Sequence, residues 1–423
     1  MIKKILLVVG LLACWAAHAQ LNITVTGGQT APQPIAVVPF QNGPGVTFDV
    51  AQIVQDDLAS SGLFKALPRS DMLEKPSTPE QVNYRNWQVL GVNDIVIGQE
   101  TASGDGVAVR FYLLDTFGQK QLLGYDMPVV PVGQLRYVAH RIADLVYQKL
   151  TGIPGYFDTQ IAYVEASGLG MHRNFKLVVA DWDGKFPHVI ASSNEPILSV
   201  AWSPDRKRLA FVGYHNNRSA VYVDTLATGT LREVTSVAGV NGSPAWSPDG
   251  RSLAVTLTTS GANTNIYIVD VATGQRRQLT HDSGINAEPA WSPDGQTIAF
   301  VSDRGGNPQI YTMPAGGGAA TRVTFEGVQN QRPAYSPNGK LLAMADVQGG
   351  LQRIAIMPAT GGPLKILTSG PVDESPSFAP NSNVLIYEKR TASGTELATV
   401  SIDGHVNQIL RGSTNVQEPA WSP

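Results

Sequence analysis

Trp246-Ser247-Pro248-Asp249-Gly250 is a stretch that this chain of 423 residues repeats, in whole or in part, throughout its C-terminal half. Successive copies place an aromatic residue at intervals of 44, 45, 44, 43 and 43 positions. A fixed period in the forties, with several short strands in each period, is typical of a β-propeller blade. The six copies are Trp202-Ser203-Pro204-Asp205, Trp246-Ser247-Pro248-Asp249-Gly250, Trp291-Ser292-Pro293-Asp294-Gly295, Tyr335-Ser336-Pro337-Asn338-Gly339, Phe378-Ala379-Pro380-Asn381 and Trp421-Ser422-Pro423.

Each motif predicts a tight turn followed by three further strands. Ser-Pro-Asp-Gly suits a type I turn, because proline fixes φ at the second position and glycine relaxes the fourth. In the repeat that starts at Trp246, the strands that follow are expected at 253–256, 265–269 and 277–280. The side chains of the first of these strands, 253–256, are apolar on both faces, as expected of a blade that is packed between two neighbours.

The two ends of the repeat region predict how the propeller closes. Residues 161–165, 175–180 and 188–191 match the three strands that follow a turn, but no aromatic motif precedes them. The last motif, Trp421-Ser422-Pro423, has no strands after it. We therefore expect a six-bladed β-propeller closed by pairing of its two ends, an arrangement that removes free sheet edges.

The residues before the propeller predict a small N-terminal α/β domain. Val50, Ile53, Val54 and Leu58 have helical spacing, and an amphipathic helix is expected at 135–150. Thr151-Gly152-Ile153-Pro154-Gly155 ends that helix and links the domains. The other expected elements are strands at 34–40, 94–98, 107–114 and 122–126 and a helix at 81–90.

The first nineteen residues predict a signal peptide for export to the periplasm. Lys3 and Lys4 precede a short apolar stretch, and Ala17-His18-Ala19 is a small-x-small cleavage site. The predicted domains are thus 1–19 for the signal peptide, 20–155 for the α/β domain and 156–423 for the propeller. An alternative is a lipoprotein, since Leu11-Leu12-Ala13-Cys14 resembles a lipobox with an acylated cysteine. Cys14 is the only cysteine, so no disulfide is expected.

Composition narrows the possible partners. The formal net charge is −3, and no basic cluster dominates the sequence, which argues against nucleic acid. No stretch after the signal is long and apolar enough for a membrane span, so we expect no stable membrane insertion. We also expect the protein to be a monomer.

Catalytic signatures are missing from the sequence. It contains no Gly-x-Ser-x-Gly, no His-Glu-x-x-His and no phosphate loop. A protein-binding role is therefore favoured over an enzyme, the alternatives being a secreted propeller hydrolase of the peptidase type or a glycan-binding protein. Trp202, Trp246, Trp291 and Trp421 are interpreted as packing between blades rather than as stacking platforms for sugars.

Polar residues that precede each aromatic motif form the candidate binding surface. If the aromatic strand is innermost, these segments gather at one mouth of the central channel and expose carboxylates and amides, Glu288 and Asn241 among them. A purely structural alternative is that Glu-Pro sets an extended backbone before the strand. A carboxylate ring could also hold Ca²⁺, although no cofactor is otherwise expected. In the first repeat, Glu195 lies farther from its aromatic residue than Glu288 does.

The expected start of the mature chain is a second candidate binding segment. Leu21, Ile23 and Val25 alternate with Asn22 and Thr24, and Gly27-Gly28 follows as a hinge. The alternation fits either an edge strand of the N-terminal domain or a detachable segment that binds a partner by strand addition.

Taken together, these features resemble the TolB family of periplasmic propeller proteins of the Tol–Pal system. The resemblance covers the whole chain. The stretches that carry it are Ile35-Ala36-Val37-Val38-Pro39-Phe40, Leu135-Arg136-Tyr137-Val138-Ala139-His140, Lys149-Leu150-Thr151-Gly152-Ile153, Ile161-Ala162-Tyr163-Val164, Asn241-Gly242-Ser243-Pro244-Ala245 and Gln329-Asn330-Gln331.

The resemblance implies two protein partners and a cellular role. It implies that the propeller mouth binds the peptidoglycan-associated lipoprotein Pal and that the N-terminal segment engages the inner-membrane protein TolA. Such a scaffold supports outer-membrane integrity and constriction during cell division. The expected Pal-like contacts are Asn241, Ser243, Asn286, Ala287, Glu288, Gln329, Gln331, Arg332, Asp373, Glu374, Gln417 and Glu418, and the expected TolA-like contacts are Gln20, Leu21, Asn22, Ile23, Thr24 and Val25.

Overall fold

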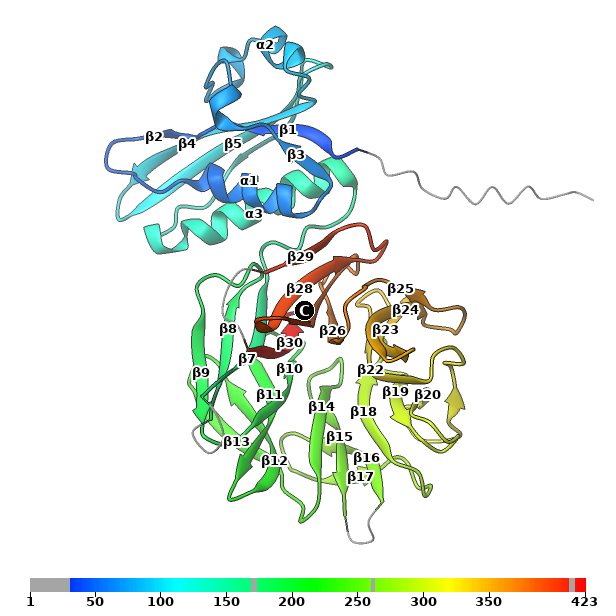
Figure 1. Ribbon diagram of the computed structural model, residues 1–423. Helices are drawn as coiled ribbons and strands as arrows, with labels where there is room; N and C mark the ends of the chain where they lie inside the picture. The colour runs from blue at the N-terminus through cyan, green and yellow to red at the C-terminus, as the bar shows by residue number, and fades with distance from the viewer. Residues whose placement is uncertain (1–30, 169–172, 260–262, 411–414) are drawn as a thin grey trace, which may run out of the picture.

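The computed structural model describes residues 31–168, 173–259, 263–410 and 415–423. An N-terminal α/β domain is followed by a propeller, and the C-terminal strand lies among the inner strands of the propeller (Figure 1). None of the helices in this described part of the chain is long and apolar enough to cross a membrane.

The N-terminal domain is built on one mixed sheet. Its strand order is β3-β1-β4-β5-β6, with β2 also paired to β4. β1 runs parallel to β3 and β4, whereas β4, β5 and β6 form an antiparallel meander. The strands are β1 (Gln33–Val37), β2 (Gln41–Asn42), β3 (Phe64–Ala66), β4 (Asp94–Ser103), β5 (Gly106–Asp115) and β6 (Lys120–Asp126).

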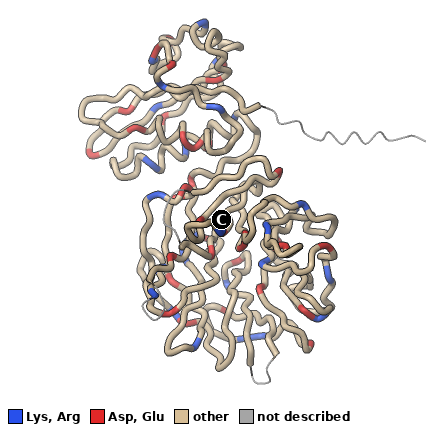
Figure 2. The backbone as a smooth tube through the Cα atoms, in the orientation of Figure 1, with Lys and Arg blue, Asp and Glu red and all other residues tan. Residues whose placement is uncertain are grey.

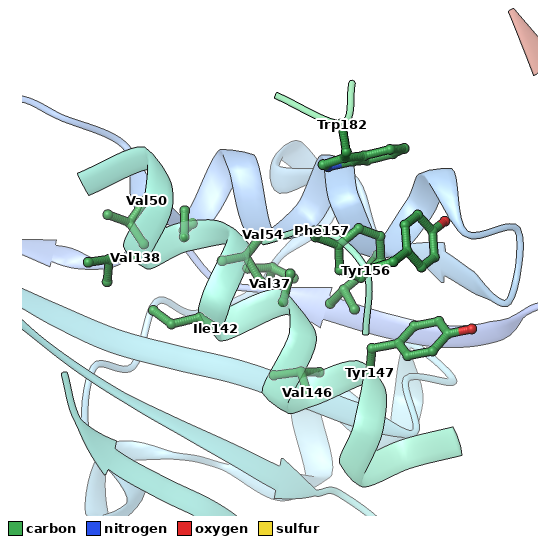
Figure 3. Close-up of a cluster of buried hydrophobic side chains, with 14 of the residues drawn as sticks. Val37, Val50, Val54, Val138, Ile142, Val146, Tyr147, Tyr156, Phe157 and Trp182 are labelled. Atoms are coloured by element: carbon green, nitrogen blue, oxygen red, sulfur yellow. The ribbon is translucent and has the colours of Figure 1, made fainter. Parts of the chain in front are cut away.

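Two helices, α1 (Val50–Ser60) and α3 (Leu135–Thr151), pack side by side against this sheet (Figure 3). Val54 of α1 and Val138, Ile142 and Val146 of α3 are fully or almost fully buried in the shared core, so the helical spacing in the sequence identified the buried faces. α3 ends at Gly152, whose φ of +75° is the left-handed conformation of a helix C-cap.

The single helix expected at 81–90 is wrong in its extent. The chain instead forms a short 3₁₀ turn, η2 (Pro79–Gln81), and then α2 (Tyr84–Val89). Thr78 and Gln81 form a capping box around η2, so this short turn ends before α2 begins. The remaining 3₁₀ turns are η1 (Arg69–Asp71) and η3 (Val132–Gln134).

The propeller has six four-stranded blades, in agreement with the repeat. In each blade the aromatic motif ends the first strand, which is the innermost, and the other strands follow outward. In chain order the blades are β10 (Ile197–Trp202), β11 (Arg208–His215), β12 (Arg218–Thr225), β13 (Thr230–Thr235); β14 (Asn241–Trp246), β15 (Ser252–Thr258), β16 (Thr264–Asp270), β17 (Arg276–Gln278); β18 (Asn286–Trp291), β19 (Thr297–Ser302), β20 (Gln309–Pro314), β21 (Thr321–Arg322); β22 (Gln329–Tyr335), β23 (Leu341–Gln348), β24 (Leu351–Pro358), β25 (Lys365–Ile366); β26 (Asp373–Phe378), β27 (Val384–Thr391), β28 (Gly394–Ser401), β29 (Asn407–Ile409); and β30 (Val416–Trp421), β7 (Gln160–Ser167), β8 (Asn174–Asp181), β9 (His188–Ser193). We number them blades 1 to 6.

The repeated turn is held by its own side chains. In blade 2 the Ser247 hydroxyl donates to Asp249 Oδ1 at 2.6 Å and accepts from the Ser252 amide at 3.0 Å. The Gly250 amide donates to the Ser247 carbonyl at 2.9 Å, and Gly250 has a φ of +68°. Serine, aspartate and glycine therefore each have a defined role in the turn.

The tryptophans join neighbouring blades. Trp202 Nε1 donates to the Ala420 carbonyl at 3.1 Å, and Trp246 Nε1 donates to the Ala201 carbonyl at 3.2 Å. Both rings are buried, so the packing interpretation is confirmed for them. Trp291 is partly exposed, and among the described residues its indole nitrogen has no hydrogen-bond partner.

Closure of the ring is confirmed. β30 pairs antiparallel with β7, with Val416 opposite Glu165 and Trp421 opposite Ile161. Beyond the strand, the Ser422 amide donates to the Gln160 carbonyl at 2.8 Å. The last strand of the chain thus completes the blade whose other strands come first.

The segment that joins the domains is fixed by aromatic packing. Tyr156 lies edge-on to Trp182 and Trp421, with ring centroids 5.3 Å and 5.7 Å away, and Phe157 lies 5.6 Å from Tyr147 of α3 (Figure 3). Gly155 allows this approach, because a Cβ there would lie 2.0 Å from Asp144 Oδ1. The domain limit that we propose at residue 155 lies in this segment.

Removing residues 417–423 tests closure. The deletion exposes the edge of β7 and removes the buried Trp421, whose loss alone costs about 3–5 kcal/mol. We expect a lower melting temperature by calorimetry and self-association by light scattering. Trp421→Ala, which keeps the strand, should be destabilised yet stay monomeric; a truncated chain that melts like the full chain and remains monomeric would contradict this role of β30.

Candidate binding site at the channel mouth

One residue from each innermost strand lines a polar cavity at one end of the propeller channel. Each lies three positions before the aromatic residue of its blade. The cavity has a volume of about 150 Å³, and its remaining lining is proline, or valine in blade 1, from the next position. We call these six residues the mouth ring: Ser199, Ser243, Glu288, Arg332, Ser375 and Glu418.

A bulge in each innermost strand places these residues at the mouth. The pairing register shifts at this point in all six strands, for example between Ala287 and Ala290. Every mouth-ring residue has a positive φ, from +46° at Ser243 to +56° at Glu418. Residues other than glycine adopt this conformation at an energetic cost, so the surrounding structure must hold it in place.

Side chains of the preceding blade stabilise the bulges. The Glu288 carboxylate accepts from the Arg332 amide at 2.7 Å, and the Glu418 carboxylate accepts from the Ser199 amide at 3.2 Å. The amide of Glu418 in turn donates to Glu388 Oε2 at 3.2 Å. The mouth-ring glutamates therefore link neighbouring blades as well as line the cavity.

Arg332 is the cation of the mouth. Its Nη1 lies 3.0 Å from Glu418 Oε2, and its Nε lies 3.8 Å from Glu374 Oε2. Although burial opposes the charge, the attraction of Glu418, Glu288 and Glu374 raises the pKa of Arg332 above its ordinary value. Burial, followed by the nearby Glu374, raises the pKa of Glu388 to about 7.

Charges of both signs are spread over the rest of the molecule (Figure 2).

The sequence raised the possibility of a Ca²⁺ site formed by a ring of carboxylates, but the described residues contain no group of side chains suited to hold the ion. In that part of the chain, no three or more His, Cys, Asp or Glu side chains are grouped so that they could hold a metal ion. Near the mouth, the Arg332 guanidinium supplies the positive charge that the carboxylates contact.

The sequence predicted that Asn241 lies on an exposed loop. This prediction is wrong. Asn241 is 1% exposed. Its side-chain amide donates to the carbonyls of Ser219 and Val237, both at 2.9 Å, and its Oδ1 accepts from the Val237 amide at 2.8 Å. The residue belongs to the strand and holds the segment before it in place.

Asn286 and Asp373 occupy the same position in their blades, five residues before the aromatic residue, and are equally buried. Asn286 donates to Asn265 Oδ1 at 3.2 Å, and Asp373 accepts from the Gly370 amide at 3.0 Å. Glu288 is only partly exposed, since it forms part of the bulge. The sequence predicted loops here because it does not show that the innermost strands already begin at Asn241, Asn286 and Asp373.

The other predicted contacts lie near the mouth and are partly exposed. Ser243 and Arg332 belong to the mouth ring. Gln329 and Gln331 bond to each other through their side chains at 3.1 Å. Ala287, Glu374 and Gln417 immediately precede mouth-ring residues. The predicted N-terminal contacts at 20–25 lie outside the described residues.

Two mouth-ring residues were missed, Ser199 and Ser375. Glu195 is not part of the ring and instead accepts from the Asn217 amide at 2.8 Å. The constant offset from the aromatic residue could have identified both serines. Valine replaces proline after Ser199, which concealed the pattern in blade 1.

The mouth faces away from the N-terminal domain. That domain contacts the propeller near the Ser-Pro turns at the other end of the inner strands, where Asn381 Nδ2 donates to the Pro154 carbonyl at 3.3 Å. Between the two ends lies a channel of about 490 Å³ lined largely by proline, alanine and aromatic side chains. The arrangement provides a polar opening above an apolar channel, a combination suited to binding part of another protein.

Family models, relatives and a solved structure that are similar to this chain all point to the same family, and together they cover nearly its whole length. Residues 21–122 match the family model of the TolB amino-terminal domain, and residues 147–423 match that of the TolB beta propeller domain. The Tol-Pal system protein TolB of Methylococcus capsulatus is 50% identical over 414 residues, which cover 98% of this chain and 96% of the relative. That of Nitrosococcus oceani is 47% identical over 426 residues, covering 100% and 98%. The crystal structure of TolB from Acinetobacter baumannii has 39% identity, a TM-score of 0.85, and coverage of 93% of this chain and 97% of that one.

Asn241→Ala tests the structural role of the buried residues behind the mouth. The change leaves backbone groups of Val237 and Ser219 without their partner, at about 1–3 kcal/mol for each group that stays buried and unpaired. We expect a clearly lower free energy of unfolding in denaturant titrations. Gln417→Ala, at a partly exposed position of another blade, is the control and should be nearly neutral.

Proposed function

This chain belongs to the TolB family, and from that premise we propose that it is a non-enzymatic, periplasmic scaffold of the Tol–Pal system that binds two other proteins. The channel mouth receives a Pal-like peptidoglycan-associated lipoprotein. The N-terminal segment binds a TolA-like inner-membrane protein. The linked assembly supports outer-membrane integrity and constriction during division.

The position and rigidity of the mouth support the first contact. The mouth ring comes from six strands that are each paired within a blade, and it lies at the end of the propeller away from the N-terminal domain. A partner can approach this face without displacing that domain. A preformed surface also binds at little cost in conformational entropy.

Apolar residues beside the ring support a protein partner over a small polar ligand. Val240, Ile285 and Val328 are 50%, 56% and 52% exposed, and they immediately precede the innermost strands of blades 2, 3 and 4. Apolar contacts next to polar groups are typical of protein interfaces. The proposed contacts are the partly exposed members of the predicted set, while Asn241, Asn286 and Asp373 shape the site from behind.

Alternating side chains support the second contact. Leu21, Ile23 and Val25 would face one side of an added strand, and Asn22 and Thr24 the other. A segment that supplies both main-chain hydrogen bonds and an apolar side is suited to strand addition.

Ser243→Arg tests the mouth as the Pal-like site. Arg332 occupies the equivalent position with a φ of +54°, close to the +46° of Ser243, so the backbone accommodates the larger side chain. We expect the affinity for the Pal-like partner to fall by at least about tenfold, or about 1.4 kcal/mol, in calorimetric titrations. The melting temperature should change little.

Gln296→Arg is the matched control, because it adds the same charge to an exposed turn at the other end of the propeller. It should bind the partner like the unaltered protein. Equal affinity of Ser243→Arg and Gln296→Arg would reject the mouth as the contact surface.

A pair of N-terminal variants tests the second contact. Replacing Leu21, Ile23 and Val25 by serine removes the apolar side of the segment, and we expect loss of TolA-like binding in pull-down and calorimetric assays. Replacing Asn22 and Thr24 by alanine keeps that side and should preserve binding. Undiminished binding by the serine variant would show that the partner uses another surface.

A further inference from the structure

A cluster of charged side chains crosses the boundary between the domains. Asp57 of α1 and Arg136 and His140 of α3 come from the N-terminal domain. Asp181, at the end of β8, and Asp183, in the turn that follows, come from blade 6 of the propeller. All of these carboxylates, and both cations, take part in at least one contact within the cluster.

Arg136 makes the direct ion pairs between the domains. Its Nε donates to Asp181 Oδ2 at 2.5 Å, and its Nη2 donates to Asp183 Oδ2 at 2.7 Å. The Arg136 side chain is only 10% exposed. Removing one member of a buried pair strands the other charge, so the two domains are held at this relative position.

His140 lies at the centre of the cluster. Its Nδ1 is 2.6 Å from Asp57 Oδ2, and its Nε2 is 3.7 Å from Asp181 Oδ2. Both His140 and Asp57 are buried. Asp57 also accepts a hydrogen bond from Trp182 Nε1 at 3.2 Å, a second link to blade 6.

Protonation of His140 reduces the excess of negative charge in the cluster. Asp57, Asp181 and Asp183 carry three negative charges, against Arg136 and Lys185, whose Nζ lies 3.3 Å from Asp183. A protonated His140 supplies the third positive charge. A neutral His140 leaves one buried carboxylate charge without compensation, which is costly in a region shielded from water.

We propose that Asp57, Arg136, His140, Asp181 and Asp183 form a pH-sensitive latch that holds the two domains in one relative orientation. The latch is closed when His140 is protonated. Loss of that proton weakens the attraction between α3 and blade 6. This inference is independent of the partners assigned above.

The surroundings of His140 fix the direction of the pH response. Burial by itself lowers the pKa of His140, but the attraction of the nearby Asp181 carboxylate and the hydrogen bond and attraction of Asp57 outweigh burial and raise it to about 9. The usual value for an unfolded chain is about 6.5. The stabilisation is therefore complete below about pH 6.5 and is lost as the pH rises through about 9.

Asp57, Asp158 and Asp181 titrate at lower pH than His140, so they do not obscure its loss of a proton near pH 9. Burial raises the pKa of Asp57 to about 6 and that of Asp158 to about 6 as well, while contact with His140 and Arg136 lowers the pKa of Asp181. These groups are ionised at pH 7 and above. The charged and titratable groups that face His140 are Asp57 of α1, Arg136 and Asp144 of α3, Asp158 of the linking segment, Asp181 of β8 and Asp183 of the turn.

A cleft borders the latch. Its volume is about 630 Å³, and Arg136, His140 and Asp181 line the cleft together with Phe157 and Arg206. His140 Nε2 has no hydrogen-bond partner among the described residues.

Distance measurements between the domains test the latch. Val89 of α2 and Phe325 of the propeller are 75% and 74% exposed. Cys14→Ser removes the only native cysteine, so that spin labels attach only to cysteines introduced as Val89→Cys and Phe325→Cys. Double electron–electron resonance should give a single narrow distribution of spin–spin distances at pH 7. A second population should grow with a midpoint near pH 9, where His140 loses its proton. Identical distributions at pH 7 and pH 10 would overturn the proposal.

Variants separate His140 from other alkaline effects. His140→Gln keeps a donor for Asp57 but cannot carry a charge, so its distance distribution should be broad at pH 7 and unchanged at pH 10. His188→Gln removes another histidine that lines the same cleft and should behave like the unaltered protein. A His140→Gln protein that keeps the narrow distance and the pH response would refute the role of His140.

Histidine NMR measures the titration of His140 directly. The His140 ring should titrate near pH 9, and Asp181→Asn should lower that value by removing an attracting charge. A His140 that titrates near 6.5 in the unaltered protein would also overturn the proposal.

Discussion

The pairing of β30 with β7 is the constraint on which the rest of this structure depends. A blade is stable only when neighbours cover both faces of its sheet, and in an open array the first and last blades would each lack one. By completing blade 6, β30 gives every blade two neighbours. The same strand supplies Glu418 to the mouth ring and Trp421 to the aromatic cluster at the domain boundary. Closure therefore organises both ends of the channel.

The bulges of the inner strands connect architecture with binding. Each bulge turns a residue into a conformation of positive φ and frees its amide from the regular ladder. Glu288 and Glu418 accept such amides from the next blade, so these glutamates cannot change without loosening a contact between blades. In the part of the chain that the structure describes, the Ser243 side chain accepts no such amide. Position 243 is thus freer than the glutamate positions to match a partner.

The contact between the domains combines two kinds of interaction with different consequences. Tyr156 packs against Trp182 and Trp421, Phe157 packs against Trp182, and this apolar packing is insensitive to pH. The ionic cluster around His140 depends on geometry and protonation, because buried charges are favourable only when every partner is in place. Apolar contact thus supplies adhesion, and the charges specify the orientation.

The sequence by itself determined the blade count, the turns, the closure and the helices α1 and α3. These features follow from local chemistry or from a repeated period: Ser247 and Asp249 bond within their own turn, and Val138, Ile142 and Val146 fall on one side of a helix whatever lies against it. Only the tertiary structure decided that Asn241 is buried and that His140 contacts Asp57 and Asp181. Those outcomes depend on strand register across a bulge and on the docking of distant segments, and neither leaves a periodic signal in the chain.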